Sequence, residues 1–172
     1  MVGDPQLFNR LLENSPYGTR TIGAVLPYLD GWLDRTHGRL GYRLVQVLTG
    51  HGCFGHYLHR IGREPTTACH QCGETDDMAQ HTLEVCKRWA VERRAMEIVI
   101  GTNDLSLHNV VAAMLSGERC WDAVVSFCDT VILKKETEEM EREEAPNAHP
   151  IRRRRMGRRR RRFAAVHRSI PQ

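Results

Sequence analysis

The sequence lacks the features that mark several common classes of protein. Aromatic residues make up only 6% of the 172 residues, and there is no internal repeat and no convincing pair of strands. No apolar stretch approaches the roughly 20 residues that a membrane-spanning helix needs, so we expect no membrane partner. The opening Met-Val-Gly-Asp-Pro has neither the basic start nor the apolar run of a secretory signal peptide, and we therefore expect no disulfides.

Signatures of common enzymes are also missing. Three glycines punctuate residues 49–55, but the segment lacks the Gly-x-x-x-x-Gly-Lys-Ser/Thr pattern of a phosphate loop. His51, His56 and His59 have no acidic or thiol partner at a diagnostic spacing, so exposed or phosphate-contacting histidines are favoured over a second metal site. A Cys53 nucleophile paired with one of these imidazoles is a weaker hypothesis still.

One group of residues does indicate a specific chemistry. Cys69, Cys72, His81 and Cys86 follow the pattern C-x2-C-x8-H-x4-C. Three thiols and an imidazole form a complete tetrahedral set for Zn²⁺ and leave no position open for water. The pattern therefore predicts a structural zinc cofactor in a binding module rather than an enzyme. We expect buried free thiols at the remaining cysteines, Cys53, Cys120 and Cys128.

The spacing of these four residues has a physical reason. Gly73 directly follows Cys72, so it can supply a tight turn that lets backbone amides approach the sulfurs. His81 and Cys86 are five residues apart, slightly more than one helical turn, so a short helix or its end can direct both toward one ion. The alternatives are four unrelated residues or a disulfide.

The segment between the ligands is rich in acidic residues. Glu74, Asp76 and Asp77 predict a solvated loop between the second and third ligands. His70 is a competing imidazole, but its position next to Cys69 predicts a side chain that points away from the ion.

Apolar periodicity predicts a mainly α fold. We expect helices over residues 5–13, 21–35, 40–48, 54–61, 89–100 and 106–115, followed by a long last helix. Pro27 lies inside the second of these and should kink it or mark its start, and Gly101 should end the fifth. The predicted fold is a small helical domain stapled by a CCHC zinc knuckle, with a disordered Arg-rich C-terminal tail. Its segments are an N-terminal helical segment (1–62), the knuckle (63–90), C-terminal helices (91–145) and the tail (146–172).

The last helix contains a regular apolar stripe. Its members follow the i, i+3, i+4, i+7 spacing and are Trp121, Val124, Val125, Cys128, Val131 and Ile132. We interpret the stripe as core rather than as a partner site. The glutamate-rich run 136–144 should then continue the helix as a solvated extension.

Charge is distributed unevenly. The formal net charge is +4, yet residues 1–133 hold 12 basic and 15 acidic side chains. Residues 150–172 hold ten arginines and no acidic residue. A polyanion should therefore bind at the tail rather than diffusely over the body. The same run is typical of a nuclear-localisation patch, so we expect the protein in the nucleus, with the cytoplasm as a further location.

Three motifs together resemble one known family. Thr49-Gly-His-Gly52, Tyr57-Leu-His-Arg-Ile-Gly62 and the Cys-Cys-His-Cys knuckle, followed by Trp89-Ala-Val-Glu-Arg-Arg94, occur in one chain. They resemble the C-terminal region of the reverse-transcriptase polyprotein of arthropod non-LTR retrotransposons. The resemblance covers most of the chain from about residue 20 and implies a helical zinc-knuckle region that engages template RNA or target DNA.

The catalytic parts of that family are not recognisable here. Its polymerase core, an RNA-directed DNA polymerase, needs a Tyr-x-Asp-Asp turn, whereas the Asp76–Asp77 pair follows Thr75 and lies inside the knuckle. The endonuclease residues are likewise not recognisable. The resemblance therefore implies a detached or truncated C-terminal piece that keeps the four zinc ligands and no catalytic residue.

Basic residues on both sides of the knuckle are candidate contacts for RNA or DNA. In the body they are Arg60, Arg63, Lys87, Arg88, Arg93 and Arg94, and Trp89 could stack on a base. In the tail they are Arg152, Arg153, Arg154, Arg155, Arg158, Arg159, Arg160, Arg161 and Arg162, which would bind without sequence preference. The alternatives are core packing for Trp89 and a solvated helix face for the arginines of the body.

Two other interpretations stay open. The chain can be a zinc-stapled protein-interaction module whose last helix pairs with a partner, with the tail serving only as a nuclear address. The mildly acidic body favours that alternative. An inert pseudogene product is the third interpretation.

Overall fold

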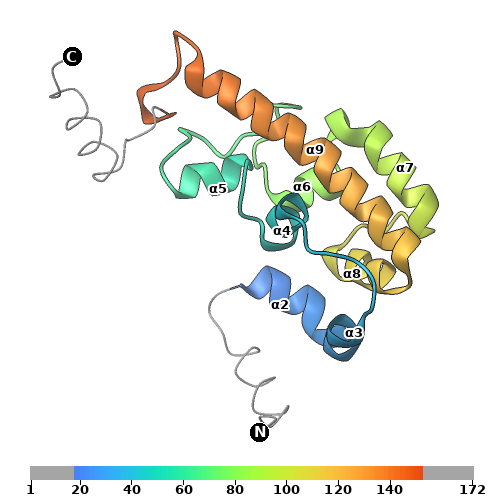
Figure 1. Ribbon diagram of the computed structural model, residues 1–172. Coiled ribbons are helices and arrows are strands. Elements are labelled where there is room, and N and C mark those ends of the chain that lie inside the picture. The colour runs from blue at the N-terminus through green and yellow to red at the C-terminus, as the bar shows by residue number, and fades with distance from the viewer. Residues whose placement is uncertain (1–17, 153–172) are drawn as a thin grey trace, which may run out of the picture.

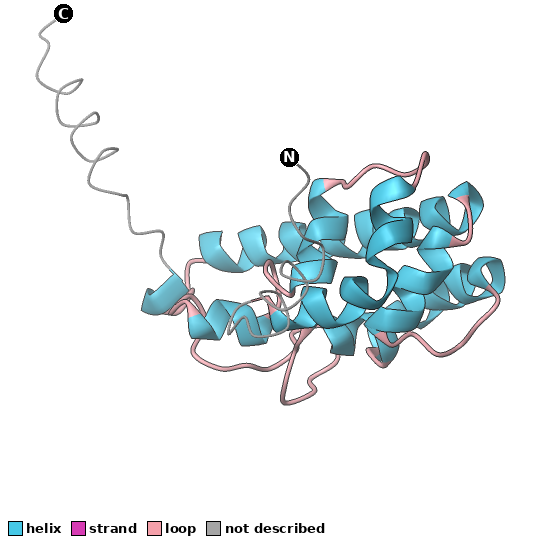
Figure 2. Cartoon of the chain, turned by 90° about the horizontal axis from the view of Figure 1, so that it is seen from below, coloured by secondary structure: helices cyan, strands magenta, loops and turns pink. Residues whose placement is uncertain are grey.

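The described part of the chain is built from helices and loops. The computed structural model describes residues 18–152, and residues 1–17 and 153–172 lie outside the description. The helices are α2 (Thr19–Val25), α3 (Leu29–Asp34), α4 (Tyr42–Thr49), α5 (Gly55–Arg60), α6 (Ala79–Glu84), α7 (Ala90–Ile100), α8 (Leu107–Leu115) and α9 (Glu118–Glu144). Short 3-10 helices cover Leu26–Tyr28 (η1), Lys87–Trp89 (η2) and Pro150–Arg152 (η3). Residues 18–152 contain no strand, so the predicted mainly α class is confirmed (Figure 2).

The long helix α9 is the element around which the others pack. It contacts α4, α7 and α8 and runs across most of the body (Figure 1). Its predicted apolar stripe is core, with Trp121, Val124, Cys128, Val131 and Ile132 each at most 1% exposed. One hydrophobic cluster joins this stripe to residues of α4, of the metal loop (residues 69–86) and of α8. None of the described helices combines the length and the apolarity needed to cross a bilayer.

Local sequence determines where several helices stop. The predicted helix over 21–35 is divided into α2, η1 and α3 at Pro27, which lacks the N–H that would continue the hydrogen-bond ladder. Gly101 ends α7 with a φ of 74°, the left-handed conformation that favours glycine. The predicted helix over 5–13 lies outside the described residues.

The glutamate-rich end of α9 is not the solvated extension that the sequence predicts. Lys135 is 0% exposed and Glu139 is 6% exposed. Glu136 accepts a hydrogen bond from Arg43 of α4 at 2.9 Å, and Glu143 pairs with Arg63. The reason is that positions 135 and 139 continue the three- and four-residue spacing of the apolar stripe, so this end of α9 faces the body with ionised groups.

Asp77 also differs from the prediction of a solvated loop. Its side chain is 3% exposed and forms an ion pair with Lys135 Nζ at 2.8 Å. The same carboxylate accepts a hydrogen bond from the Gly55 amide at 2.9 Å and from the Thr82 hydroxyl at 3.4 Å. The Lys135 ammonium lies 5.4 Å from the centre of the Phe54 ring. This buried pair therefore joins α9 to α5, α6 and the metal loop.

We predict that Lys135→Met destabilises the fold by about 3 kcal/mol or more, because it leaves the buried Asp77 carboxylate without its partner. Lys134→Met is the matched control, since Lys134 is 42% exposed and pairs with Glu92 at the surface. The control should cost at most about 1 kcal/mol. Urea denaturation measures both free energies of unfolding, and equal small losses would contradict the structural role assigned to Lys135.

Candidate metal centre

The four predicted ligands converge on one point. The ligand atoms of Cys69, Cys72, His81 and Cys86 all lie within 4.8 Å of one another. Cys69 Sγ and Cys86 Sγ are 3.9 Å apart, and Cys72 Sγ is 3.3 Å from His81 Nε2. Metal–sulfur bonds of about 2.3 Å in a tetrahedron place two sulfurs about 3.8 Å apart. The cluster therefore has the dimensions of a tetrahedral site and can hold a metal ion.

Backbone hydrogen bonds form the turn that presents the first two thiols. The Gly73 amide donates to the Cys69 carbonyl at 2.8 Å, and the Cys69 amide donates to the Glu74 carbonyl at 2.8 Å. Gly73 has a φ of 81°, so the residue after the second thiol needs the access to positive φ that glycine has, as predicted.

The second half of the site comes from α6. His81 lies in α6, and Cys86 follows the end of that helix, where its amide donates to the His81 carbonyl at 2.8 Å. Both ligands are thus fixed by one short helix and its end, as the spacing predicts. Cys86 is fully buried, whereas Cys72 is only partly covered, so solvent reaches the cluster from the side of the first turn.

The Arg93 side chain binds the backbone of the metal loop and is not exposed at the surface. It is 8% exposed. Its guanidinium donates to the carbonyls of Leu83 at 2.9 Å, Cys86 at 2.7 Å and Thr82 at 3.4 Å. The Thr82 and Leu83 carbonyls are among those that the end of α6 leaves without helical partners, and the Cys86 carbonyl belongs to the segment that follows. The predicted contact of Arg93 with nucleic acid is therefore wrong, because its donors hold the ligand-bearing segment in place.

Trp89 is likewise unavailable to a base. It is 0% exposed and belongs to the hydrophobic core, so the core-packing alternative is confirmed and the stacking prediction is wrong. The Arg88 guanidinium lies 5.0 Å from the centre of its ring and covers it from the solvent side.

A second buried cluster lies behind the first turn of the site. His70 Nε2 is 2.8 Å from a Glu64 carboxylate oxygen, so His70 points away from the ligands, as predicted. Arg152 pairs with the same carboxylate and donates to Glu139 at 3.3 Å. Arg152 is 5% exposed, so its predicted place in a free, disordered tail is wrong. The other predicted tail contacts, from Arg153 to Arg162, lie outside the described residues.

Helix α9 also holds the metal loop through Gln71, which stands between the first two thiols. The Gln71 amide nitrogen donates to Glu138 at 2.7 Å, and its oxygen accepts from Lys135 Nζ at 3.0 Å. Sequence analysis overlooked Gln71 and Lys135 because a polar residue in a loop and a lysine beside a glutamate run both resemble solvated surface. The available signal was the continuation of the 3–4 spacing past Ile132.

Burial sets the protonation of the ligands in the absence of an ion. It raises the pKa of the Cys69 thiol to about 12, with the nearby Asp77 carboxylate adding to the shift, and it also raises the pKa of Cys86. Burial lowers the pKa of His81, which keeps its imidazole neutral and able to coordinate. A metal ion must therefore displace thiol protons when it binds.

The remaining predicted contacts fall into separate groups. Arg60 is exposed at the end of α5, whereas Lys87, Arg88 and Arg94 are exposed on η2 and α7. Figure 1 shows α5 and α7 well apart on the body, so the structure does not bring these groups to one surface. Arg94 pairs with Glu97 at 3.3 Å, and Arg63 pairs with Glu143.

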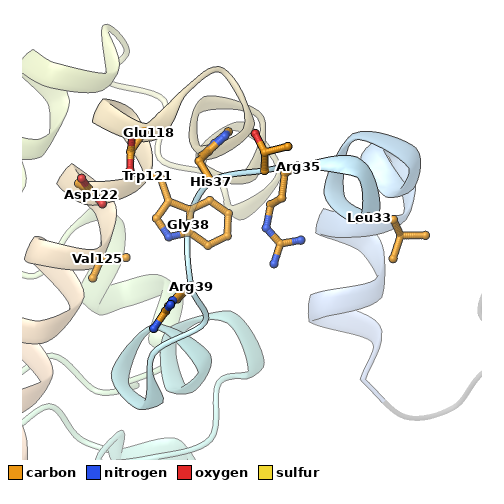
Figure 3. Close-up of a pocket in the computed structure, with 10 residues that line it drawn as sticks. Leu33, Arg35, His37, Gly38, Arg39, Glu118, Trp121, Asp122 and Val125 are labelled. Carbon is orange, nitrogen blue, oxygen red and sulfur yellow. The ribbon is translucent and has the colours of Figure 1, made fainter.

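An open cavity of about 650 Å³ lies between the loop after α3 and the start of α9, away from the four ligands in sequence (Figure 3). Gly38 lies against Trp121, and a Cβ at Gly38 would come within 2.2 Å of the indole. The lining mixes two guanidinium groups with two carboxylates, so its charge favours neither anions nor cations; these residues are Arg35, Arg39, Glu118 and Asp122. No pattern in the sequence indicated this cavity.

The chain was compared with protein-family models, with curated proteins and with solved structures, and nothing matches in any of the three.

We predict that Cys86→Ser lowers the metal content of the purified chain far below one ion per chain and lowers its melting temperature, because serine is a poor ligand and the site contributes to folding. Cys120→Ser is the control, since Cys120 is half-buried and lies outside the cluster. Elemental analysis and a thermal melt measure both variants. Equal metal content in the two would contradict the ligand assignment.

We also predict that binding of one ion at pH 7 releases at least about two protons, because the Cys69 and Cys86 thiols bind theirs tightly. Metal affinity should consequently fall as the pH is lowered. Titration calorimetry in buffers of different ionisation enthalpy counts the protons. Release of less than one proton would show that the thiols are already ionised.

Proposed function

We propose that this chain is a zinc-dependent nucleic-acid-binding module from the C-terminal region of a non-LTR retrotransposon reverse transcriptase, without the polymerase or endonuclease core. One observation supports the proposal most strongly. The cluster of three thiols and one imidazole is embedded in a helical body, and the arginine-rich run begins at Arg152, the last residue that the structure describes. A rigid module with an attached polycation is typical of proteins that bind polynucleotides.

Zinc is the metal that the donor set favours. Soft thiolates with one imidazole suit Zn²⁺ and disfavour Mg²⁺ and Ca²⁺, which prefer oxygen ligands. With four protein ligands the coordination shell is full, so the ion would fold the loop and not activate water. The module is accordingly proposed as a binding protein and not as an enzyme.

The two parts of the chain would contribute differently to binding. The arginine run attracts any polyanion, RNA or DNA, and its contribution weakens steeply with salt. Arg152 ties the start of this run to Glu64 and Glu139 and lies 2.9 Å from His70, which stands between two metal ligands. Closure of the metal loop would thereby fix the point from which the run departs. The same run supports the proposed location in the nucleus.

We predict that a chain ending at Arg152 binds single-stranded RNA more weakly and with a smaller dependence on salt than the full chain. The slope of log K against log salt should fall to a value that reflects only about two or three phosphate contacts. The cut belongs after Arg152 and not at Pro150, because the buried Arg152–Glu64 pair must be kept. Fluorescence anisotropy measures both chains, and metal content confirms that both fold.

The outcome distinguishes the two roles of the chain. Residual binding that requires Cys72 would support a contribution of the body, whereas complete loss would assign all binding to the run. Failure of the full chain to bind RNA or DNA at low salt would contradict the proposed function.

A protein-interaction module is the second candidate, and one observation favours it. Val91 is 81% exposed and Ile98 is 67% exposed, and they lie two turns apart on α7. An apolar pair of this kind on one helix face suits a protein partner. Replacing both by serine should leave RNA binding unchanged if the proposed function is right.

A further inference from the structure

A small pocket beside the metal loop combines positive charge with an aromatic wall. It has a volume of about 160 Å³ and lies between the start of α2, the turn after α4, helix α5 and the start of α6. Phe54, which is 0% exposed, is among its lining residues. The side chains that give it chemical character are Arg20, His51, His56, Tyr57 and Arg60.

The two arginines of this pocket are not neutralised by acids. Arg20 donates to the Val47 carbonyl at 3.3 Å and to the Gln80 side-chain oxygen at 2.8 Å, and both acceptors are neutral. Within residues 18–152, no carboxylate lies within ion-pair distance of Arg20 or Arg60. Burial lowers the pKa of Arg20, and the charge of the Glu84 carboxylate partly offsets this shift without forming an ion pair.

Several other arginines of the body, by contrast, do pair with acids. Arg43, Arg63 and Arg152 each pair with a glutamate. Arg20 is instead held in one orientation by two neutral acceptors, from α4 and α6, which leaves its charge available to an incoming anion. Nε and one hydrogen each of Nη1 and Nη2 are used by these acceptors, so the second hydrogens of Nη1 and Nη2 are the donors that can reach a phosphate oxygen.

An aromatic stack stands beside the guanidinium groups. The His51 and Tyr57 rings have centroids 4.9 Å apart, and the Arg60 guanidinium lies 5.2 Å from the centre of the Tyr57 ring. His51 and Arg60 are exposed. Unpaired bases stack on aromatic rings and on guanidinium planes, whereas bases in a duplex are not available for such contacts.

The pocket is built partly from the metal loop. Met78 and Ala79, which help to line it, lie between the second and third metal ligands, and His56 bonds to Asp76 of the same loop at 2.9 Å. The order of the loop therefore affects the shape of the pocket. The volume is below the roughly 300 Å³ of sites for whole small molecules, so the pocket can enclose one base or one phosphate group, with the rest of a nucleotide at its mouth.

We propose that this pocket binds one nucleotide of a single-stranded polynucleotide, with the phosphate held by Arg20 and Arg60 and the base stacked against His51 and Tyr57. This inference rests on the proposed nucleic-acid-binding function and assigns it to a specific place on the body. It keeps Arg60 from the sequence prediction and adds Arg20, His51 and Tyr57, whereas Trp89 and the basic residues after the knuckle take no part.

Photocrosslinking tests the assignment directly on the full chain. The probe is a single-stranded RNA oligonucleotide that contains 4-thiouridine, used at about 0.3 M salt, where attraction to the arginine run is weakened. We expect crosslinked peptides that contain residues 51–60. Crosslinks confined to residues 153–162 would overturn the pocket while leaving the proposed function intact, and failure of the full chain to bind the probe at low salt would overturn both.

Variants supply the second measurement. Tyr57→Leu should weaken binding by about tenfold because it removes the ring on which the stack depends, whereas Tyr57→Phe should bind as the parent does. Arg60→Ala should weaken binding severalfold, and Arg119→Ala is the control because Arg119 is exposed on α9 and outside the pocket. Unchanged affinity in Arg60→Ala together with unchanged affinity in a Tyr57→Leu chain that retains its zinc would overturn the inference.

Discussion

The ion pair between Lys135 and Asp77 is the contact on which the arrangement of the body depends. Both side chains are almost completely buried, and the carboxylate also accepts hydrogen bonds from the Gly55 amide and the Thr82 hydroxyl. Removing two charges from water is costly, so the pair is favourable only when all of these groups are in place together. Lys135 therefore stabilises one specific docking of α9 on the metal loop instead of a general apolar association.

The metal site and α9 stabilise each other through shared residues. Gln71 stands between two ligands and bonds to both Lys135 and Glu138 of α9. On the other side of the same turn, His70 bonds to Glu64, whose carboxylate pairs with Arg152. An ion that closes the loop would order these partners, and α9 in turn holds the first ligand turn in position. The position of Arg152, where the arginine run starts, would therefore depend on whether an ion occupies the site.

Sequence alone was sufficient for the parts of the structure that depend on local chemistry. The ligand set was recognisable because few other roles require three thiols and an imidazole at this spacing, and the apolar stripe of α9 was recognisable from its period. Pro27 and Gly101 marked helix ends because proline lacks the amide N–H that continues a helix and glycine readily adopts the left-handed conformation that ends one.

The buried charges could not be predicted from sequence because their partners are distant in the chain. Asp77 and Lys135 are 58 residues apart, and only the tertiary fold brings them together. Arg152 pairs with Glu64, which is likewise distant in the chain. Arg93 bonds to carbonyls only 7 to 11 residues away, but neither its role nor the choice between stacking and core packing for Trp89 shows in the sequence, because such side chains reveal their role only through what they contact. The cationic pocket was missed because its residues come from α2, α5 and the turn after α4, which only the tertiary fold brings together.

Amide hydrogen exchange of the full chain, measured before and after metal chelation, shows whether the metal loop and α9 are coupled. We expect chelation to reduce the protection of residues 69–86 and of the 135–144 end of α9 together, while α8 keeps its protection. Loss of protection confined to residues 69–86, or unchanged exchange throughout the chain, would contradict this coupling.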